Sequence, residues 1–245
     1  MDKNDRKRIH INFASTPGTP LLFCTPAQVT ALLREERKPV FLIRHGLTAW
    51  NMQMRLQGRE NIPLNADGHN QAKHCASFLG KALIENKVPL ESVYTSPLTR
   101  AYDTAAYIAD SLGFERPSVE KGLIERDYGS LSGLTPAKKK ALYPTPADYP
   151  KDVESIPNAA RRMKRILSQM CQEKADRAIV AVTHGGIMNA LFSSLTGGRA
   201  GLGPNVTQNC AVAMVAVGRG DIIPLAFNMN DRVFPEYVSQ IDFLI

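Results

Sequence analysis

From residue 40 onward, short apolar runs typical of strands alternate with longer amphipathic segments typical of helices. Buried strands are predicted at 40–43, 90–96 and 177–183, and helices at 67–86, 97–113, 159–174 and 186–198. Strands separated by helices form βαβ crossovers, because parallel partner strands need a long connection. The sequence therefore predicts an α/β fold with a mainly parallel central sheet and helices on both of its faces.

The two ends of the chain depart from this alternation. Residues 211–217 and 222–228 predict two strands joined by a hairpin at "GRGD". Residues 1–38 contain the turn-rich stretch "STPGTP" and a short helix at 25–37, with Thr25 as its cap and Pro26 at its first position. No internal repeat or low-complexity linker divides the remainder. We therefore expect an N-terminal extension at 1–38 and one domain at 39–245.

Composition narrows the class of protein. No apolar run approaches the ~20 residues that span a bilayer, and "MDKNDRKRIH" lacks the apolar region of a secretory signal. These features predict a cytoplasmic protein without membrane partners. Cys24, Cys75, Cys171 and Cys210 form no closely spaced pair, which favours reduced thiols over a disulfide or metal framework.

The net charge of +7 favours anionic partners, either small phosphates or nucleic acid. The densest basic clusters are "KKK" at 138–140 and "RRMKR" at 161–165. Apolar residues at helical spacing follow the second cluster, which predicts that its basic residues form the solvated face of a helix. Aromatic residues are not interleaved with either cluster, so we expect no nucleic-acid partner.

Polar residues end three of the predicted strands. The strand at 40–43 is followed by Arg44, His45 and Gly46, and the strand at 177–183 by His184 and Gly185. Ligands of open parallel sheets lie beyond the carboxyl ends of the strands, so both histidines are predicted to face one cleft. One such histidine is explained equally well as a turn cap. Two in the same setting favour a site.

Two arginines are predicted to meet at the same edge. Arg100 lies one turn into the helix that follows the strand ending at Ser96, and Arg44 precedes His45. Like charges repel, so a dianion between the two guanidinium groups is the natural ligand. Guanidinium forks match phosphate oxygens two at a time, as lysine does not.

Five blocks of the chain, in order, resemble the histidine phosphatase superfamily, the phosphoglycerate mutase-like clan. They are "RHGLTAWN" at 44–51, "LQG" at 56–58, "SPLTRAYDTA" at 96–105, "LIERDYGSLSG" at 123–133 and "VTHGG" at 182–186. The resemblance runs from about residue 40 to residue 230. It implies a three-layer α/β/α sandwich, in agreement with the alternation of strands and helices.

The resemblance also implies a role for each matching residue. His45 would be the nucleophile that forms a phosphohistidine, and Glu125 the general acid that protonates the leaving oxygen. The other implied site residues hold the phosphoryl oxygens or line the pocket: Arg44, Arg100, His184, Asn51, Gln57, Gly58, Tyr128 and Gly185. Without the resemblance, Glu125 would be interpreted as a surface ion-pair residue beside Arg126 and Asp127.

Elementary chemistry agrees with this division of roles. A nucleophilic imidazole must be neutral, and the positive charge of two arginines should lower the pKa of His45. The same arginines hold the charge of the transferred group, so we expect no metal and no cofactor. An alcohol leaving group needs a proton, which a carboxyl group supplies.

The two branches of the family differ in the phosphoryl acceptor. Water makes a phosphatase, and a bound phosphoglycerate makes a mutase primed by 2,3-bisphosphoglycerate. Tyr128 matches a substrate-contacting tyrosine of the mutases. Gly186 and the short segment between Glu125 and His184 are instead typical of the phosphatases. Pro136 stands where the mutases have a lysine, although three lysines follow it at 138–140. We predict a phosphatase of a small phosphorylated metabolite, with the mutase as the alternative.

An inactive binding member of the clan is a third hypothesis, and it predicts the loss of a core residue. Arg44, His45, Arg100, Glu125 and His184 are all present, which argues against it. The oligomeric state stays open, with a homodimer as one alternative.

Overall fold

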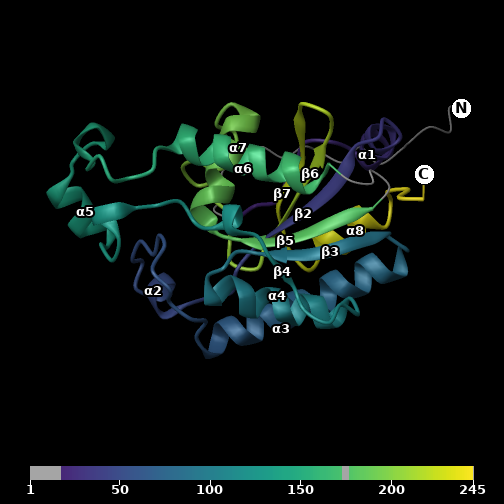
Figure 1. The fold of residues 1–245 in the computed structure, drawn as a ribbon, viewed down its shortest axis with the longest axis horizontal. Coiled ribbons are helices and arrows are strands. Elements are labelled where there is room, and N and C mark those ends of the chain that lie inside the picture. Colours follow the sequence, from purple (N-terminus) through teal and green to yellow (C-terminus); the bar gives the residue numbers. More distant parts are fainter. Residues whose placement is uncertain (1–17, 173–176, 245) are drawn as a thin grey trace, which may run out of the picture.

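The structure is a computed structural model that describes residues 18–172 and 177–244. One seven-stranded sheet, in the order β1-β7-β6-β2-β5-β3-β4, runs through the described part of the chain (Figure 1). The strands are β1 (Leu21–Leu22), β2 (Lys38–Arg44), β3 (Leu90–Thr95), β4 (Ser118–Val119), β5 (Ala178–Thr183), β6 (Val212–Val217) and β7 (Ile222–Met229).

The sheet is mixed because its two halves are built differently. Strands β2, β5, β3 and β4 are parallel neighbours, as the predicted crossovers require. β6 runs antiparallel to both β2 and β7, and β1 runs antiparallel to β7. The predicted hairpin at "GRGD" is confirmed as the β6–β7 connection, which makes these two strands antiparallel to each other. β2 therefore lies between the parallel and antiparallel halves.

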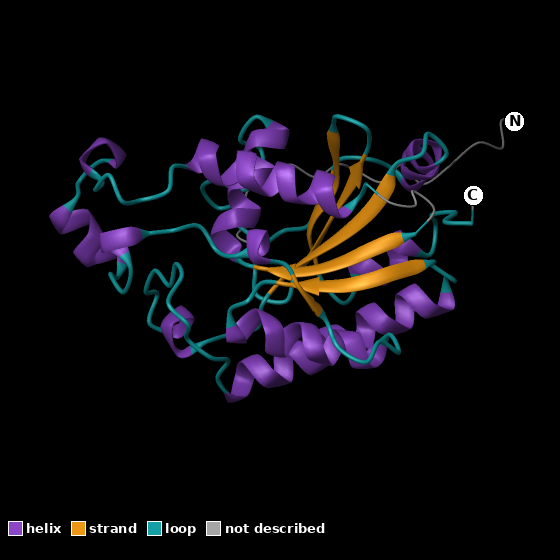
Figure 2. Ribbon diagram, in the orientation of Figure 1, coloured by secondary structure: helices purple, strands orange, loops and turns teal. Residues whose placement is uncertain are grey.

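Helices cover both faces of the sheet, so the predicted three-layer sandwich is present (Figure 2). The principal ones are α3 (Ala66–Glu85), α4 (Thr99–Ser111) and α8 (Val233–Val238) on one face and α6 (Ile156–Met170) and α7 (Gly185–Thr196) on the other. Each face has its own apolar core, which shares alternate residues of the buried strands: Phe41 and Ile43 belong to the first, Val40 and Leu42 to the second. This alternation follows from the period of two along a strand.

Local capping explains where several helices begin. The Thr25 side chain and Gln28 form a reciprocal capping box at α1 (Pro26–Leu33), as the Thr25-Pro26 pair predicts. Ser155 caps α6, so this helix begins three residues before the predicted start at 159. Gly197 ends α7 in the left-handed conformation, with a φ of 60°.

Part of the predicted N-terminal extension packs on the domain. Leu21 and Leu22 of β1 pair with β7, and Val29 and Leu33 of α1 belong to the core beneath α3 and α4. Residues 1–17 lie outside the described residues. The sequence-based division of the chain at residue 38 remains a prediction.

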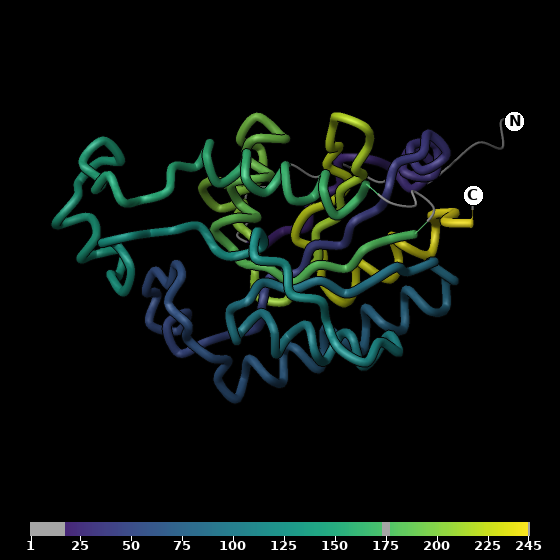
Figure 3. The backbone as a smooth tube through the Cα atoms, in the orientation of Figure 1, coloured from purple at the N-terminus to yellow at the C-terminus, as the bar shows by residue number. Residues whose placement is uncertain are grey.

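A projecting lobe lies beyond the carboxyl ends of the parallel strands. We define this lobe as residues 129–155, which contain η2 (Gly129–Leu131), α5 (Pro136–Leu142) and η3 (Pro146–Asp148). The tube in Figure 3 shows the lobe in teal and green, opposite the blue loop that contains α2 (Ala49–Met52). Both lie at the end of the molecule away from the N and C labels. Within the described residues, no helix combines the length and the apolar character needed to cross a membrane.

Candidate active site

The register between β2 and β5 brings the two predicted histidines together. Arg44 lies opposite Thr183, so His45 and His184 follow at the same level of adjacent parallel strands. The backbone N–H of His45 donates to the carbonyl of Thr183 at 3.0 Å. The two imidazole rings are 5.1 Å apart between centroids, and both side chains are buried. The two histidines thus lie side by side at the carboxyl ends of β2 and β5, and their roles stay predictions.

The hydrogen bonds of His45 define its tautomer. Nδ1 lies 2.7 Å from the carbonyl oxygen of Gly46. A carbonyl only accepts, so Nδ1 carries the proton and Nε2 holds a free lone pair. Nε2 faces the Nε–H of Arg100 at 3.2 Å. His45 therefore presents its basic nitrogen toward the arginine.

Arg100 is held by the backbone of the loop after α2. Its Nη1 donates to the carbonyl of Glu60 at 2.6 Å, and its Nη2 to the carbonyl of Gly58 at 2.8 Å. The side chain is fully buried. All three guanidinium nitrogens thus have a partner, and the planar fork fixes the direction in which Nε points.

Arg44 has one buried guanidinium nitrogen without a hydrogen-bond partner in the described part of the chain. Its Nη1 donates to the carbonyl of Thr207 at 2.7 Å, while its Nε is buried without a hydrogen-bond partner among the described residues. A buried unpaired N–H of a cation is costly unless a ligand satisfies it. The guanidinium group lies against Gly185, where an added Cβ would come within 3.1 Å of Nε. Gly185 therefore makes room for Arg44.

His184 is oriented by Ser96, a residue to which the sequence assigned no role. The Nε2 of His184 lies 2.7 Å from the hydroxyl oxygen of Ser96, which also accepts from the N–H of Leu98. The Nδ1 of His184 is buried without a partner among the described residues. Because β3 ends at Thr95 beside β5, strand pairing brings the backbone of Ser96 near His184, while the hydrogen bond itself depends on the direction of the two side chains.

Burial and positive charge act in the same direction on both imidazoles. Burial lowers the pKa of His45 well below its ordinary value, and the charges of Arg100 and Arg44 lower it further. Burial and the same two arginines also lower the pKa of His184. Burial lowers the pKa of Arg100 to about 10, so Arg100 remains cationic near neutrality. The site thus combines neutral histidines with charged arginines.

Glu125 is buried, so its interpretation as a surface ion-pair residue is wrong. It is 6% exposed, and its Oε2 accepts from the N–H of Gly186 at 2.9 Å while its Oε1 accepts from the N–H of Ile187 at 2.7 Å. These N–H groups belong to the first turn of α7, where the helix dipole favours an anion. His184 is the N-cap of that helix. One helix terminus thus positions both the second histidine and the carboxyl group.

Glycines at this edge are required by close packing, which the sequence did not indicate. A Cβ on Gly46 would come within 2.5 Å of the Gly68 carbonyl, so this glycine allows the close contact with α3. A Cβ on Gly186 would meet the hydroxyl of Tyr128 at 2.6 Å and the Oε1 of Glu125 at 2.7 Å. Gly186 therefore allows the tyrosine and the carboxylate to lie side by side.

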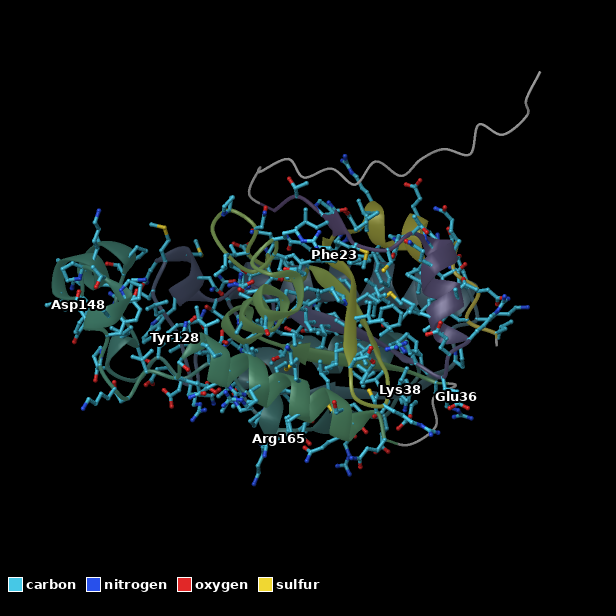
Figure 4. All side chains as sticks on the ribbon, turned by 90° about the horizontal axis from the view of Figure 1, so that it is seen from above. Phe23, Glu36, Lys38, Tyr128, Asp148 and Arg165 are labelled. Atoms are coloured by element: carbon cyan, nitrogen blue, oxygen red, sulfur yellow. The ribbon has the colours of Figure 1, made fainter. Side chains whose placement is uncertain are left out.

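Arg162 corrects the interpretation of the second basic cluster. Its side chain is 16% exposed and turns inward, with Nη1 donating to the carbonyls of Gly122 and Ile124 and Nη2 to the carbonyl of Glu125. It also forms an ion pair with Glu154 at 2.8 Å. The cluster predicted to be a solvated face thus contributes the side chain that holds the backbone around Glu125. In Figure 4 the neighbouring Arg165 projects outward.

The remaining predicted binding residues lie around the same edge. Asn51 uses its amide oxygen in the capping box of α2, where it accepts from the N–H and hydroxyl of Thr48. Gln57 is buried, and its Oε1 has no partner among the described residues. Gly58 has a φ of 52° and supplies a carbonyl to Arg100. Burial, and next the nearby Glu125, raise the pKa of Tyr128. Their roles toward a substrate stay predictions.

Potential metal-ligating side chains do not gather in groups of three in the described part of the chain. Among the described residues there is no group of three or more histidine, cysteine, aspartate or glutamate side chains that could hold a metal ion. The four cysteines are free thiols, and Cys75 is buried. The charges that act on His45 are those of Arg100 and Arg44, and Glu125 acts on both of these arginines.

The sequence model of the histidine phosphatase superfamily (branch 1) matches residues 40–230. That range contains both histidines, both arginines and Glu125, and it covers most of the chain. The protein belongs to the histidine phosphatase superfamily. The resemblance seen in the five sequence blocks is thereby confirmed.

Several relatives share long stretches of this chain. A protein of Bacillus subtilis (strain 168) named as an uncharacterized phosphatase is 33% identical over 65% of this chain and 78% of its own length. A metal-independent phosphoserine phosphatase of Arabidopsis thaliana is 33% identical over 67% of this chain and 71% of its own. A 2,3-bisphosphoglycerate-dependent phosphoglycerate mutase of Gloeobacter violaceus is 28% identical over 63% and 74%.

A solved structure of a mycobacterial glucosyl-3-phosphoglycerate phosphatase with VO3 has the same fold. Its TM-score is 0.62 with 27% identity, over 77% of this chain and 99% of that chain. The predicted fold class is thus confirmed. Phosphatases and a mutase are among its relatives, and the solved structure is that of a phosphatase, so the protein is an enzyme of this superfamily.

Proposed function

We propose that the protein hydrolyses a small phosphate monoester through a phosphohistidine at Nε2 of His45. The observation that carries this proposal is the pairing of His45: the Gly46 carbonyl fixes the proton on Nδ1, and Arg100 faces Nε2. The nucleophilic lone pair and a fixed positive charge thus converge on one point. A phosphorus atom bound there has its charge balanced without a metal.

Each phosphoryl oxygen has a candidate donor. The unpaired Nε of Arg44 and the unpaired Nδ1 of His184 are buried at the same edge as Arg100. A bound phosphoryl group takes the Nε–H of Arg100 from His45 as the phosphorus–nitrogen bond forms. The role of His184 depends on its tautomer. If Nε2 donates its proton to Ser96, Nδ1 is an acceptor; if the Ser96 hydroxyl donates to Nε2, Nδ1 carries the proton and is a donor. Only the second arrangement stabilises a phosphoryl oxygen.

The reaction proceeds in two displacements. Nε2 of His45 attacks phosphorus and the ester P–O bond breaks. The negative charge of the bound phosphoryl group opposes the anionic form of Glu125, so Glu125 takes up a proton in the substrate complex and gives it to the departing alcohol. Water then attacks the phosphohistidine, the P–N bond breaks, and the carboxylate of Glu125 takes the proton from that water. Inorganic phosphate leaves, and His45 is again neutral.

One experiment tests the covalent step. The protein is mixed with a ³²P-labelled monoester and quenched within milliseconds to seconds, and the acid-labile label on protein is counted. His45→Ala should show neither label nor turnover, because no other described nucleophile is paired with Arg100. The control variant His69→Ala, on the outer helix α3, should keep both. A turnover-competent His45→Ala enzyme contradicts the proposal.

The mutase is retained as a second candidate because of Tyr128, whose hydroxyl lies beside Glu125 across Gly186. With 3-phosphoglycerate and catalytic 2,3-bisphosphoglycerate, we expect release of inorganic phosphate to exceed formation of 2-phosphoglycerate. A mutase must shield its phosphohistidine from water, and the short segment after Glu125 favours an open cleft. Accumulation of 2-phosphoglycerate with negligible free phosphate would replace the phosphatase assignment by the mutase.

A further inference from the structure

A pocket of about 570 Å³ lies between the lobe and the start of α6. Leu56 belongs to its lining, and two backbone hydrogen bonds join this residue to the lobe: Leu56 N–H to the Leu134 carbonyl at 3.0 Å and Gly133 N–H to the Leu56 carbonyl at 2.7 Å. The volume is in the range of small-molecule sites. The pocket is therefore built by fixed backbone contacts.

Tyr128 connects this pocket to the candidate active site. Its ring lines the pocket, and its hydroxyl lies at the Gly186 edge next to the Oε1 of Glu125. Figure 4 shows Tyr128 between the body of the molecule and the far tip of the lobe at Asp148. Glu125 is the residue that would protonate the leaving oxygen. An alcohol that departs past Glu125 and Tyr128 therefore extends into this pocket.

The chemistry of the lining selects what enters it. Most of the wall is apolar, including Leu131, Pro150, Val153 and Ile156. Two cations also line it, and each lies over a tyrosine ring: Arg126 over Tyr128 at 5.1 Å and Lys139 over Tyr149 at 5.5 Å.

Neither cation is neutralised by a carboxylate. Among the described residues, Arg126 and Lys139 have no ion pair within 4.0 Å, and no aspartate or glutamate lines the pocket. Of the three lysines at 138–140, only Lys139 is half-buried, while Lys138 and Lys140 are exposed. The pocket thus offers apolar surface together with uncompensated positive charge.

We propose that this pocket binds the alcohol part of the ester and selects alcohols that carry both an apolar body and an anionic group. The inference rests on the proposed phosphatase function and adds the substrate class to it. The apolar body packs on the proline, valine and isoleucine side chains. The anionic group pairs with Lys139 and Arg126.

Two matched esters test this proposal: 4-propylphenyl phosphate and the phosphate ester of 3-(4-hydroxyphenyl)propanoate. They differ only in a terminal methyl against a terminal carboxylate, so their leaving groups are similarly basic. We expect kcat/KM to be about two- to fivefold higher for the carboxylate ester, the size expected of a half-exposed ion pair. Lys139→Gln should reduce this preference, because only Arg126 then remains to pair with the carboxylate, whereas Lys140→Gln should keep it.

A second pair of variants tests the wall. Val153→Asp should lower kcat/KM for the carboxylate ester more than for the propyl ester, while Val153→Asn should lower both equally. Equal kcat/KM for the two esters in the wild type, or an unchanged preference in Lys139→Gln, would overturn the inference and leave the phosphatase intact. Failure of the wild type to hydrolyse either ester would instead overturn the proposed function, and the inference with it.

Discussion

At the scale of single residues, the direction in which each donor points is set by the hydrogen bonds that the side chain already makes. Arg100 donates from two of its nitrogens to the carbonyls of Gly58 and Glu60, and its third nitrogen faces His45. Arg100 therefore contributes a donor in a fixed direction as well as a positive charge. Lysine has one ammonium group on a flexible stem and cannot reproduce three fixed directions.

Arg100→Lys should accordingly lower kcat by roughly 10²–10³, the usual cost of losing one preorganised donor. The measurement is steady-state kinetics with phenyl phosphate, and Arg161→Lys on the exposed face of α6 is the matched control. A change of only two- or threefold in kcat would show that Arg100 does not contact the transferring group.

Burial of neutral histidines also sets a pH dependence of stability. The pKa values of folded His45 and His184 lie well below 6.5, so below pH 6.5 the unfolded chain binds protons that the folded chain does not. Stability is therefore fully present above pH 6.5 and is lost as the pH falls. Each imidazole contributes a slope of up to about 1.4 kcal/mol per pH unit.

This dependence should appear in urea unfolding between pH 6.5 and 5.5. Either His45→Gln or His184→Gln should remove about half of the histidine-linked slope, because each leaves one buried imidazole. If neither substitution flattens the slope, the two rings are not held neutral in the folded protein.

At the scale of elements, the first turn of α7 and the side chain of Arg162 act together on Glu125. The helix terminus binds the carboxylate, and Arg162 binds the backbone around it. Arg162→Met should destabilise the fold by about 2 kcal/mol, since Glu154 loses the partner of a largely buried ion pair. It should also lower kcat at least tenfold, because the loop at 122–125 loses its donors.

The two effects of this substitution are separable. The double variant Arg162→Met/Glu154→Leu should regain part of the thermal stability, because no unpaired carboxylate remains, but it should not regain kcat. Arg165→Met, on the outer face of the same helix, should change neither. Recovery of kcat in the double variant would mean that Arg162 acts on stability alone.

At the scale of the whole molecule, the features predicted correctly are those that a local sequence pattern determines. Apolar runs that end on Arg44-His45 and on His184 identify strand ends, and parallel pairing then brings the two histidines together. Contacts across distant segments carry no such pattern. Ser96 meets His184 across 88 positions, and Arg162 turns inward although its neighbours in "RRMKR" predict a solvated face. The antiparallel pairing of β6 with β2 was likewise not indicated, because the predicted hairpin fixes β6 only relative to β7.

The whole arrangement of charge leads to the last prediction, which concerns metal dependence. Two arginines hold the phosphoryl charge, and Glu125 is committed to the N–H groups of α7 rather than to a cluster of carboxylates of the kind that binds Mg²⁺. Activity with phenyl phosphate should therefore survive dialysis against EDTA and be unchanged by added Mg²⁺. Vanadate, which adopts the five-coordinate geometry of the transferring group, should inhibit at concentrations well below the KM of the substrate. Loss of activity on chelation that returns with a divalent metal would contradict the arginine-based mechanism.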